Sequence, residues 1–136
     1  MQKTIQATNE YFSCASRNYG FVFKKFVRKT WGYEAIHVNT LKYCMKTLHI
    51  IPGLSTSMHY HRDKTETLYV AKGSLRIEYF IDDPQNANII SLNEGMSFTV
   101  IPNLKHRLIN DYSSETIIVE ASTFDSPRDS YRMEYP

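Results

Sequence analysis

The stretch from residue 53 to residue 73, GLSTSMHYHRDKTETLYVAKG, holds the strongest pattern in the chain. His59 and His61 are two residues apart, so on an extended backbone both side chains point to the same face. Glu66 follows after a short polar segment that can bring its carboxylate to that face. Imidazole nitrogens and carboxylate oxygens bind divalent transition metals, so the stretch predicts part of a metal site.

A third histidine must come from elsewhere in the chain, and His106 is the candidate. It lies between Pro102 and Asn110, at the start of a later predicted strand. Three imidazoles and one carboxylate suit one divalent ion of Mn, Fe, Co, Ni or Zn, and leave positions open for water or substrate. The predicted metal ligands are His59, His61, Glu66 and His106.

Short β-rich segments, each ended by turn residues, follow one another along the chain. Leu75, Ile77 and Tyr79 alternate with polar residues, which is typical of a strand with one face in water. Turn residues at 52–53 and 102–103 end other segments. No segment of ten or more residues has a helical period, so the chain is predicted to be an all-β sandwich or barrel. The predicted strands are 43–51, 68–71, 75–79, 88–92, 97–101, 107–109 and 116–121.

Length and composition indicate one globular domain. The chain has 136 residues, of which 42% are hydrophobic, and its ten Tyr and seven Phe favour strands. We expect residues 1–26 to form an N-terminal arm or edge strand, residues 43–123 the barrel, and residues 124–136 a C-terminal tail.

Charge and cysteine content restrict the partners and the location. The formal net charge is +2, and no run of Lys and Arg is longer than two residues, which argues against nucleic-acid binding. The N-terminus has no apolar signal-peptide core, and no apolar stretch approaches the roughly 20 residues of a membrane helix. Cys14 and Cys44 are expected to be free thiols, with one disulfide between them as the open alternative. We therefore expect a cytoplasmic protein that does not bind membranes.

Two motifs resemble those of the cupin superfamily. The first, G-x5-H-x-H-x4-E-x6-G, is met at every spacing by Gly53, His59, His61, Glu66 and Gly73. The second, G-x5-P-x-G-x2-H-x3-N, is met in part by Gly95, Pro102, His106 and Asn110. Pro102 comes one residue late and Leu104 stands where a glycine would be, which predicts a tighter turn before His106. The resemblance implies a double-stranded β-helix, a jelly-roll barrel of six or more antiparallel strands.

From about Lys29 to Tyr135 the chain is also similar to the C-terminal cupin domain of type II phosphomannose isomerases. The similar features are the T-W-G-Y-E segment at 30–34, Lys46, the segment 101–110, Glu120, and Asp129-x-x-Arg132. One ligand position departs from that family, because His59 stands where the family often carries Gln.

This resemblance implies aldose–ketose isomerisation of a sugar or sugar phosphate such as mannose 6-phosphate. A metal would bind the carbonyl and the adjacent hydroxyl, and Lys46 and Arg107 would hold the phosphate. Glu120, or a metal-bound hydroxide, would move the proton between C1 and C2. We also expect a homodimer, since small cupins often pair through their sheets.

Other interpretations remain open. Lys46 could be a surface lysine, Arg107 could brace the barrel through a carboxylate, and Glu120 could pair with either cation. The whole site could instead belong to an Fe(II)-dependent dioxygenase, or to a carbohydrate-binding or sensing module without turnover.

Overall fold

A computed structural model describes residues 15–16, 20–21 and 25–133, and every regular element in these ranges is a strand. The expected N-terminal arm therefore lies almost wholly outside the described residues. None of the described residues forms a helix that is long and apolar enough to cross a membrane. The strands are β1 (Ala15–Ser16), β2 (Gly20–Phe21), β3 (Lys25–Lys29), β4 (Gly32–Asn39), β5 (Cys44–Ile50), β6 (His59–Tyr60), β7 (Glu66–Lys72), β8 (Ser74–Phe80), β9 (Asn88–Asn93), β10 (Ser97–Val100), β11 (Lys105–Ile109), β12 (Thr116–Ser122) and β13 (Tyr131–Arg132).

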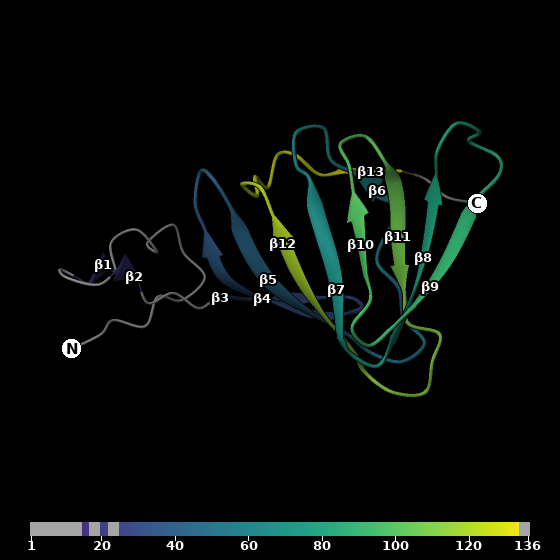
Figure 1. Ribbon diagram of the computed structural model, residues 1–136, viewed down its shortest axis with the longest axis horizontal. Coiled ribbons are helices and arrows are strands. Elements are labelled where there is room, and N and C mark those ends of the chain that lie inside the picture. The colour runs from purple at the N-terminus through teal and green to yellow at the C-terminus, as the bar shows by residue number, and fades with distance from the viewer. Residues whose placement is uncertain (1–14, 17–19, 22–24, 134–136) are drawn as a thin grey trace.

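The strands form two main antiparallel sheets (Figure 1). One sheet has the order β10-β7-β12-β5-β4-β3, and the other has the order β13-β6-β11-β8-β9. Several neighbours, such as β7 and β12 or β8 and β11, are distant in sequence, as in a jelly roll, where the chain crosses repeatedly between the two layers. The all-β jelly-roll prediction is therefore confirmed.

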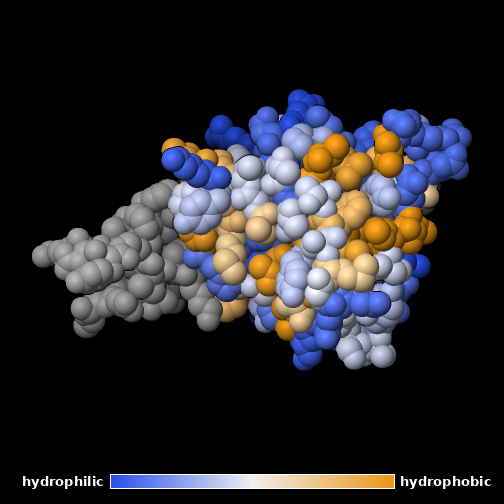
Figure 2. Space-filling view, viewed as in Figure 1, coloured by the Kyte–Doolittle hydropathy of each residue, from blue (hydrophilic) through white to orange (hydrophobic). Residues whose placement is uncertain are grey.

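The core lies between the two sheets because alternate residues of each strand point inward. Leu48 and Ile50 of β5 are buried on one side, and Leu75 and Ile77 of β8 are buried on the other. Each such side chain contributes roughly 1.5–3 kcal/mol by leaving water. Trp31, just before β4, packs into the same cluster. Some apolar side chains also remain on the outer surface (Figure 2).

The predicted strands of the barrel agree with the observed ones to within two residues at most ends. Before these strands, β4 begins at Gly32. Gly32 has a φ of 147°, and a Cβ there would lie 1.9 Å from the carbonyl oxygen of His49 on β5. Only glycine allows β4 and β5 to approach so closely at this point.

The tight turn predicted before His106 is present and has a clear geometric basis. Asn103 has a φ of 69°, the left-handed conformation that Asn tolerates better than most residues. Leu104 N–H donates to the carbonyl of Ile101 at 3.2 Å, and Asn103 N–H donates to the carbonyl of His61 at 2.6 Å. The shortened turn therefore binds directly to the segment that carries the first two histidines.

Candidate metal centre

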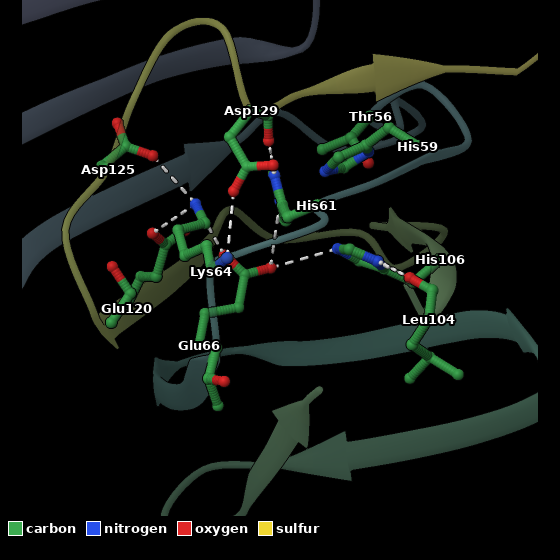
Figure 3. A network of polar contacts seen from close by, with 12 residues as sticks. Thr56, His59, His61, Lys64, Glu66, Leu104, His106, Glu120, Asp125 and Asp129 are labelled. Atoms are coloured by element: carbon green, nitrogen blue, oxygen red, sulfur yellow. Dashed lines mark hydrogen bonds and ion pairs between the residues drawn. The ribbon is translucent and has the colours of Figure 1, made fainter. Parts of the chain in front are cut away.

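Three histidines meet between the two sheets. His59 lies on β6, His61 follows directly after that strand, and His106 lies on β11 opposite His59. One ring nitrogen from each lies within 4.8 Å of the others, so the three side chains could hold a metal ion. Figure 3 shows the three imidazoles facing one shared space.

The backbone orients each imidazole in the same way. The Nδ1 atoms of His59, His61 and His106 lie 2.8, 2.7 and 2.9 Å from the carbonyl oxygens of Ser57, Asp129 and Leu104, respectively. A carbonyl only accepts hydrogen bonds, so each Nδ1 carries a proton and each ring can turn Nε2 toward an ion. The Nε2 atom of His106 lies 3.1 Å from Glu66 Oε1 and would exchange this hydrogen bond for an ion. This arrangement is typical of metal-binding histidines, and the residues therefore fit a divalent transition metal.

The electrostatics also favour the neutral, metal-binding form of His59 and His61. Burial and the nearby His106 lower the pKa of His59 to about 4. Burial and the positive charge of Lys64 lower the pKa of His61. Both imidazoles are therefore neutral at physiological pH, and an ion would not have to displace a proton from them.

Glu66, the fourth predicted ligand, is buried beside the histidines. Its Oε1 lies 3.1 Å from His106 Nε2 and 3.8 Å from His61 Nε2. Burial alone would raise the pKa of Glu66, but the hydrogen bond with His106 and the charge of Lys64 hold it well below its ordinary value. The carboxylate is therefore ionised and close to the position of an ion, and its role as a ligand remains a prediction.

Lys64, which is not among the predicted site residues, lies at the centre of the buried polar network. Its Nζ lies 3.0 Å from Glu66 Oε2, 3.0 Å from Asp125 Oδ1 and 3.3 Å from Glu120 Oε2. Burial disfavours the ammonium, but these three carboxyl groups together raise the pKa of Lys64 far above its ordinary value. Lys64 and Glu66 are two residues apart, and this spacing could have indicated from the sequence that both side chains face the site.

Lys46 lines the same cavity but is already paired. Its Nζ lies 2.8 Å from Asp125 Oδ2 and 3.7 Å from Glu34 Oε1. Burial opposes the charge of Lys46, yet Glu120, Asp125 and Glu34 together raise its pKa. Its interpretation as a surface lysine is wrong, because only 5% of the residue is exposed.

Glu120 also faces the cavity, from β12, and is buried. Burial and the neighbouring Glu66 carboxylate raise the pKa of Glu120 to about 7, against the opposing effect of Lys64. A carboxyl group with such a pKa can both accept and donate a proton near neutral pH.

Arg107 does not join this group, which corrects the expected pairing of Lys46 and Arg107 around a phosphate. Arg107 follows His106 directly on β11, so the two side chains point to opposite faces of the strand. Its Nη2 lies 2.7 Å from Glu78 Oε2 on β8, and it is not among the described residues that line the cavity. The alternative, that Arg107 braces the barrel through a carboxylate, is what the structure shows.

The C-terminal segment, expected to be a tail, helps to build the site. The Asp129 carboxylate accepts the backbone N–H groups of Arg62, Asp63 and Lys64 at 2.7–3.3 Å. The carbonyl oxygen of Asp129 is the atom that binds His61 Nδ1. The similarity to D-x-x-R therefore has a structural meaning, since Asp129 fixes the loop between the histidines and Glu66.

The three histidines, both buried lysines, Glu66 and Glu120 open onto one cavity of about 480 Å³. This volume lies within the range of small-molecule sites. The histidines and Glu66 lie together in its wall, and Glu120, Lys46 and Lys64 lie in the same wall. The arrangement can therefore place a small polar ligand between a metal ion and a group that exchanges protons.

Comparisons with known proteins agree with this fold. Residues 46–121, more than half of the chain, match the family model described as the cupin domain. The capsular polysaccharide assembling protein CapF from Staphylococcus aureus is similar in structure, with a TM-score of 0.73, 14% identity, and 82% of this chain aligned to 34% of that one. Oxalate decarboxylase from Bacillus subtilis has a TM-score of 0.71 and 16% identity, with 81% of this chain aligned to 30% of that one.

The chain thus spans about a third of the length of these structural relatives, and at such low identity the likeness shows the fold alone. No curated protein matches the chain in sequence. The match over residues 46–121 covers both predicted motifs, from before His59 to beyond His106. This chain belongs to the cupin family.

Proposed function

We propose that this protein is a metal-dependent enzyme that interconverts an aldose and a ketose, with a sugar or sugar phosphate as substrate. The observation that carries the proposal is the shared cavity, in which the three histidines and the buried carboxyl group of Glu120 face the same space. Isomerisation needs these two functions, a centre that binds adjacent oxygens and a group that moves a proton between neighbouring carbons.

The chain supplies the parts as follows. A bound divalent ion would polarise the carbonyl of the open-chain sugar. Glu120 takes the proton from C2 and returns it to C1, while the proton of the 2-hydroxyl ends on O1, so that the aldehyde becomes a ketone without net loss or gain of atoms. Lys64, 3.3 Å from Glu120, holds the carboxylate in place when it is ionised.

Proton exchange with solvent gives a sensitive test. Metal-loaded protein is incubated with mannose 6-phosphate in D2O, and NMR follows the appearance of fructose 6-phosphate with deuterium at C1. We expect Glu120→Gln to lower the rate by a factor of about 10²–10⁴. Glu115→Gln, which removes a carboxylate that pairs with His49 outside the cavity, should leave the rate unchanged.

The absence of product and of deuterium exchange across a panel of aldoses and aldose phosphates would contradict the proposal. Sugar binding that persists in Glu120→Gln without any exchange in the wild type would instead favour a binding or sensing protein.

A second candidate function is that of an Fe(II)-dependent dioxygenase, and one observation favours it. Glu66 Oε1 lies within 4 Å of both His61 and His106. Two histidines and one carboxylate with open positions are the ligand set of many Fe(II) oxygenases. Oxygen consumption by the iron-loaded protein with small organic substrates would support this function, and indifference to oxygen would count against it.

A further inference from the structure

Three cationic side chains line the cavity in addition to the two buried lysines. Lys25 and Lys29 lie on β3, the edge strand of the six-stranded sheet, and Arg132 lies on β13 of the other sheet. On β3 the cavity is lined by Lys25, Val27 and Lys29, while the residues between them are exposed. Alternation along the strand therefore turns both lysines toward the same space as the histidines.

The carboxylates of the cavity are already occupied by other cations. Asp125 pairs with Lys46 and Lys64, and Glu34 pairs with Lys46. Glu66 and Glu120 both lie against Lys64.

Among the described residues, no carboxylate pairs with the three outer cations. Within the described ranges, Lys25, Lys29 and Arg132 form no ion pair. Among the residues that the structure describes, no carboxylate offsets the positive charge at this part of the cavity, and a bound divalent ion would add to it.

We propose that Lys25, Lys29 and Arg132 form an anion subsite that selects small ligands carrying a phosphate or carboxylate group. The cavity of about 480 Å³ has room for a ligand that reaches the histidines with its other end. Lysine and arginine bind such groups by charge-assisted hydrogen bonds, and an opening lined by cations concentrates anions from solution. This subsite rests on the proposed function in one respect only: the part of the ligand between its anionic group and the end that reaches the histidines is a sugar.

The first test uses inorganic phosphate as a probe that needs no sugar. Isothermal titration of the EDTA-treated protein at low ionic strength should show phosphate binding that weakens as salt is added. We expect Lys25→Gln/Lys29→Gln and Arg132→Gln each to weaken it by about tenfold. The control pair Lys42→Gln/Lys72→Gln removes two exposed lysines that do not line the cavity and should have no effect.

The second test compares three forms of one sugar on the metal-loaded protein: mannose, mannose 6-phosphate and mannuronate. The two charged forms should bind at least tenfold more tightly than mannose, and the difference should disappear in Lys25→Gln/Lys29→Gln. Tighter binding of mannose 6-phosphate would identify a phosphate site, and tighter binding of mannuronate would identify a carboxylate site. An unchanged metal content in the variants confirms that they are folded.

The anion subsite and the isomerase activity can be tested independently. Equal affinity for mannose and its charged forms, or no phosphate binding by the wild type, would overturn the subsite even if mannose is isomerised. Preference for the charged forms that is lost in the variants would establish the subsite even if no ketose is formed.

Discussion

Lys64 Nζ lies 3.0 Å from Glu66 Oε2, on the side of the carboxylate that faces away from the histidines. The other oxygen, Oε1, lies 3.1 Å from His106 Nε2 (Figure 3). The two oxygens of one carboxylate therefore have different partners. Lys64 restricts Glu66 to offering one oxygen to an ion, because the second oxygen is held by the ammonium.

Replacement of Lys64 by Met should affect both stability and metal coordination. The variant leaves Glu66, Glu120 and Asp125 close together without the central ammonium, so we expect a loss of roughly 3–5 kcal/mol in the free energy of unfolding. Glu66 is then free to bind an ion through both oxygens, which should change the visible absorption spectrum of the Co²⁺-loaded protein. Lys42→Met, at an exposed lysine, should alter neither property. A Lys64→Met protein with wild-type stability and an unchanged spectrum would show that Lys64 does not hold Glu66.

The double variant His59→Ala/His61→Ala should lose bound metal. Each substitution removes one of three imidazoles that could share an ion, and the remaining His106 cannot hold it alone. Elemental analysis of the purified proteins measures the effect. A control variant, His37→Ala/His49→Ala, removes two histidines that do not line the cavity and should keep its metal. Stoichiometric metal in the first variant would rule out this site.

Asp129→Ala should weaken metal binding although Asp129 has no atom among the predicted ligands. Its carboxylate accepts the backbone N–H groups of residues 62–64 and so fixes the loop that joins His61 to Glu66. Loss of a supporting group of this kind lowers metal affinity by about 10–100-fold. Competition with a fluorescent zinc chelator measures the change. Asp111→Ala, which removes an ion pair with Arg76 at the surface, serves as the control, and an equal effect in both variants would contradict the role of Asp129.

Glu120 should make the EDTA-treated protein less stable as pH rises toward neutrality. The pKa of Glu120 is raised from 4.5 to about 7, so between these values the folded protein keeps a proton that the unfolded chain releases. The contribution of Glu120 to stability is therefore full below about pH 4.5 and falls as pH rises to about 7, by roughly 1–3 kcal/mol. His59 has the opposite effect, because its lowered pKa makes its contribution rise with pH between about 4 and 6.5.

Urea unfolding at pH 5 and pH 7 separates the two contributions through the variant Glu120→Gln. Relative to the wild type, the variant should have a higher free energy of unfolding at pH 7 than at pH 5. Glu94→Gln, at an exposed carboxylate, should show no such shift. A difference that does not depend on pH would mean that Glu120 is ionised throughout this range.

Local sequence patterns predicted the parts of the site that lie on one strand or one turn. His59 and His61 follow the two-residue period of extended chain, and the strands around them were found from the same period. The same rule could have excluded Arg107, since adjacent residues on a strand cannot both face the cavity when His106 does.

The buried charge network could not be predicted in the same way. Lys64 meets Asp125 and Glu120 only because the end of β12 pairs with the start of β7 in the same sheet. Contacts between such distant residues depend on the complete sheet order, which short-range patterns do not determine. The C-terminal segment was expected to be a tail for the same reason.

The pairing of β13 with β6 has a consequence for the order of events during biosynthesis. Residues 129–132 leave the ribosome long after His59 and His61, yet the Asp129 carbonyl orients His61 and Arg132 pairs in register with His59. A nascent chain that has not reached these residues exposes both histidines without their final orientation. An ion that binds these imidazoles in their final orientation would therefore bind only after residues 129–132 have docked, and not as soon as the motif itself is synthesised.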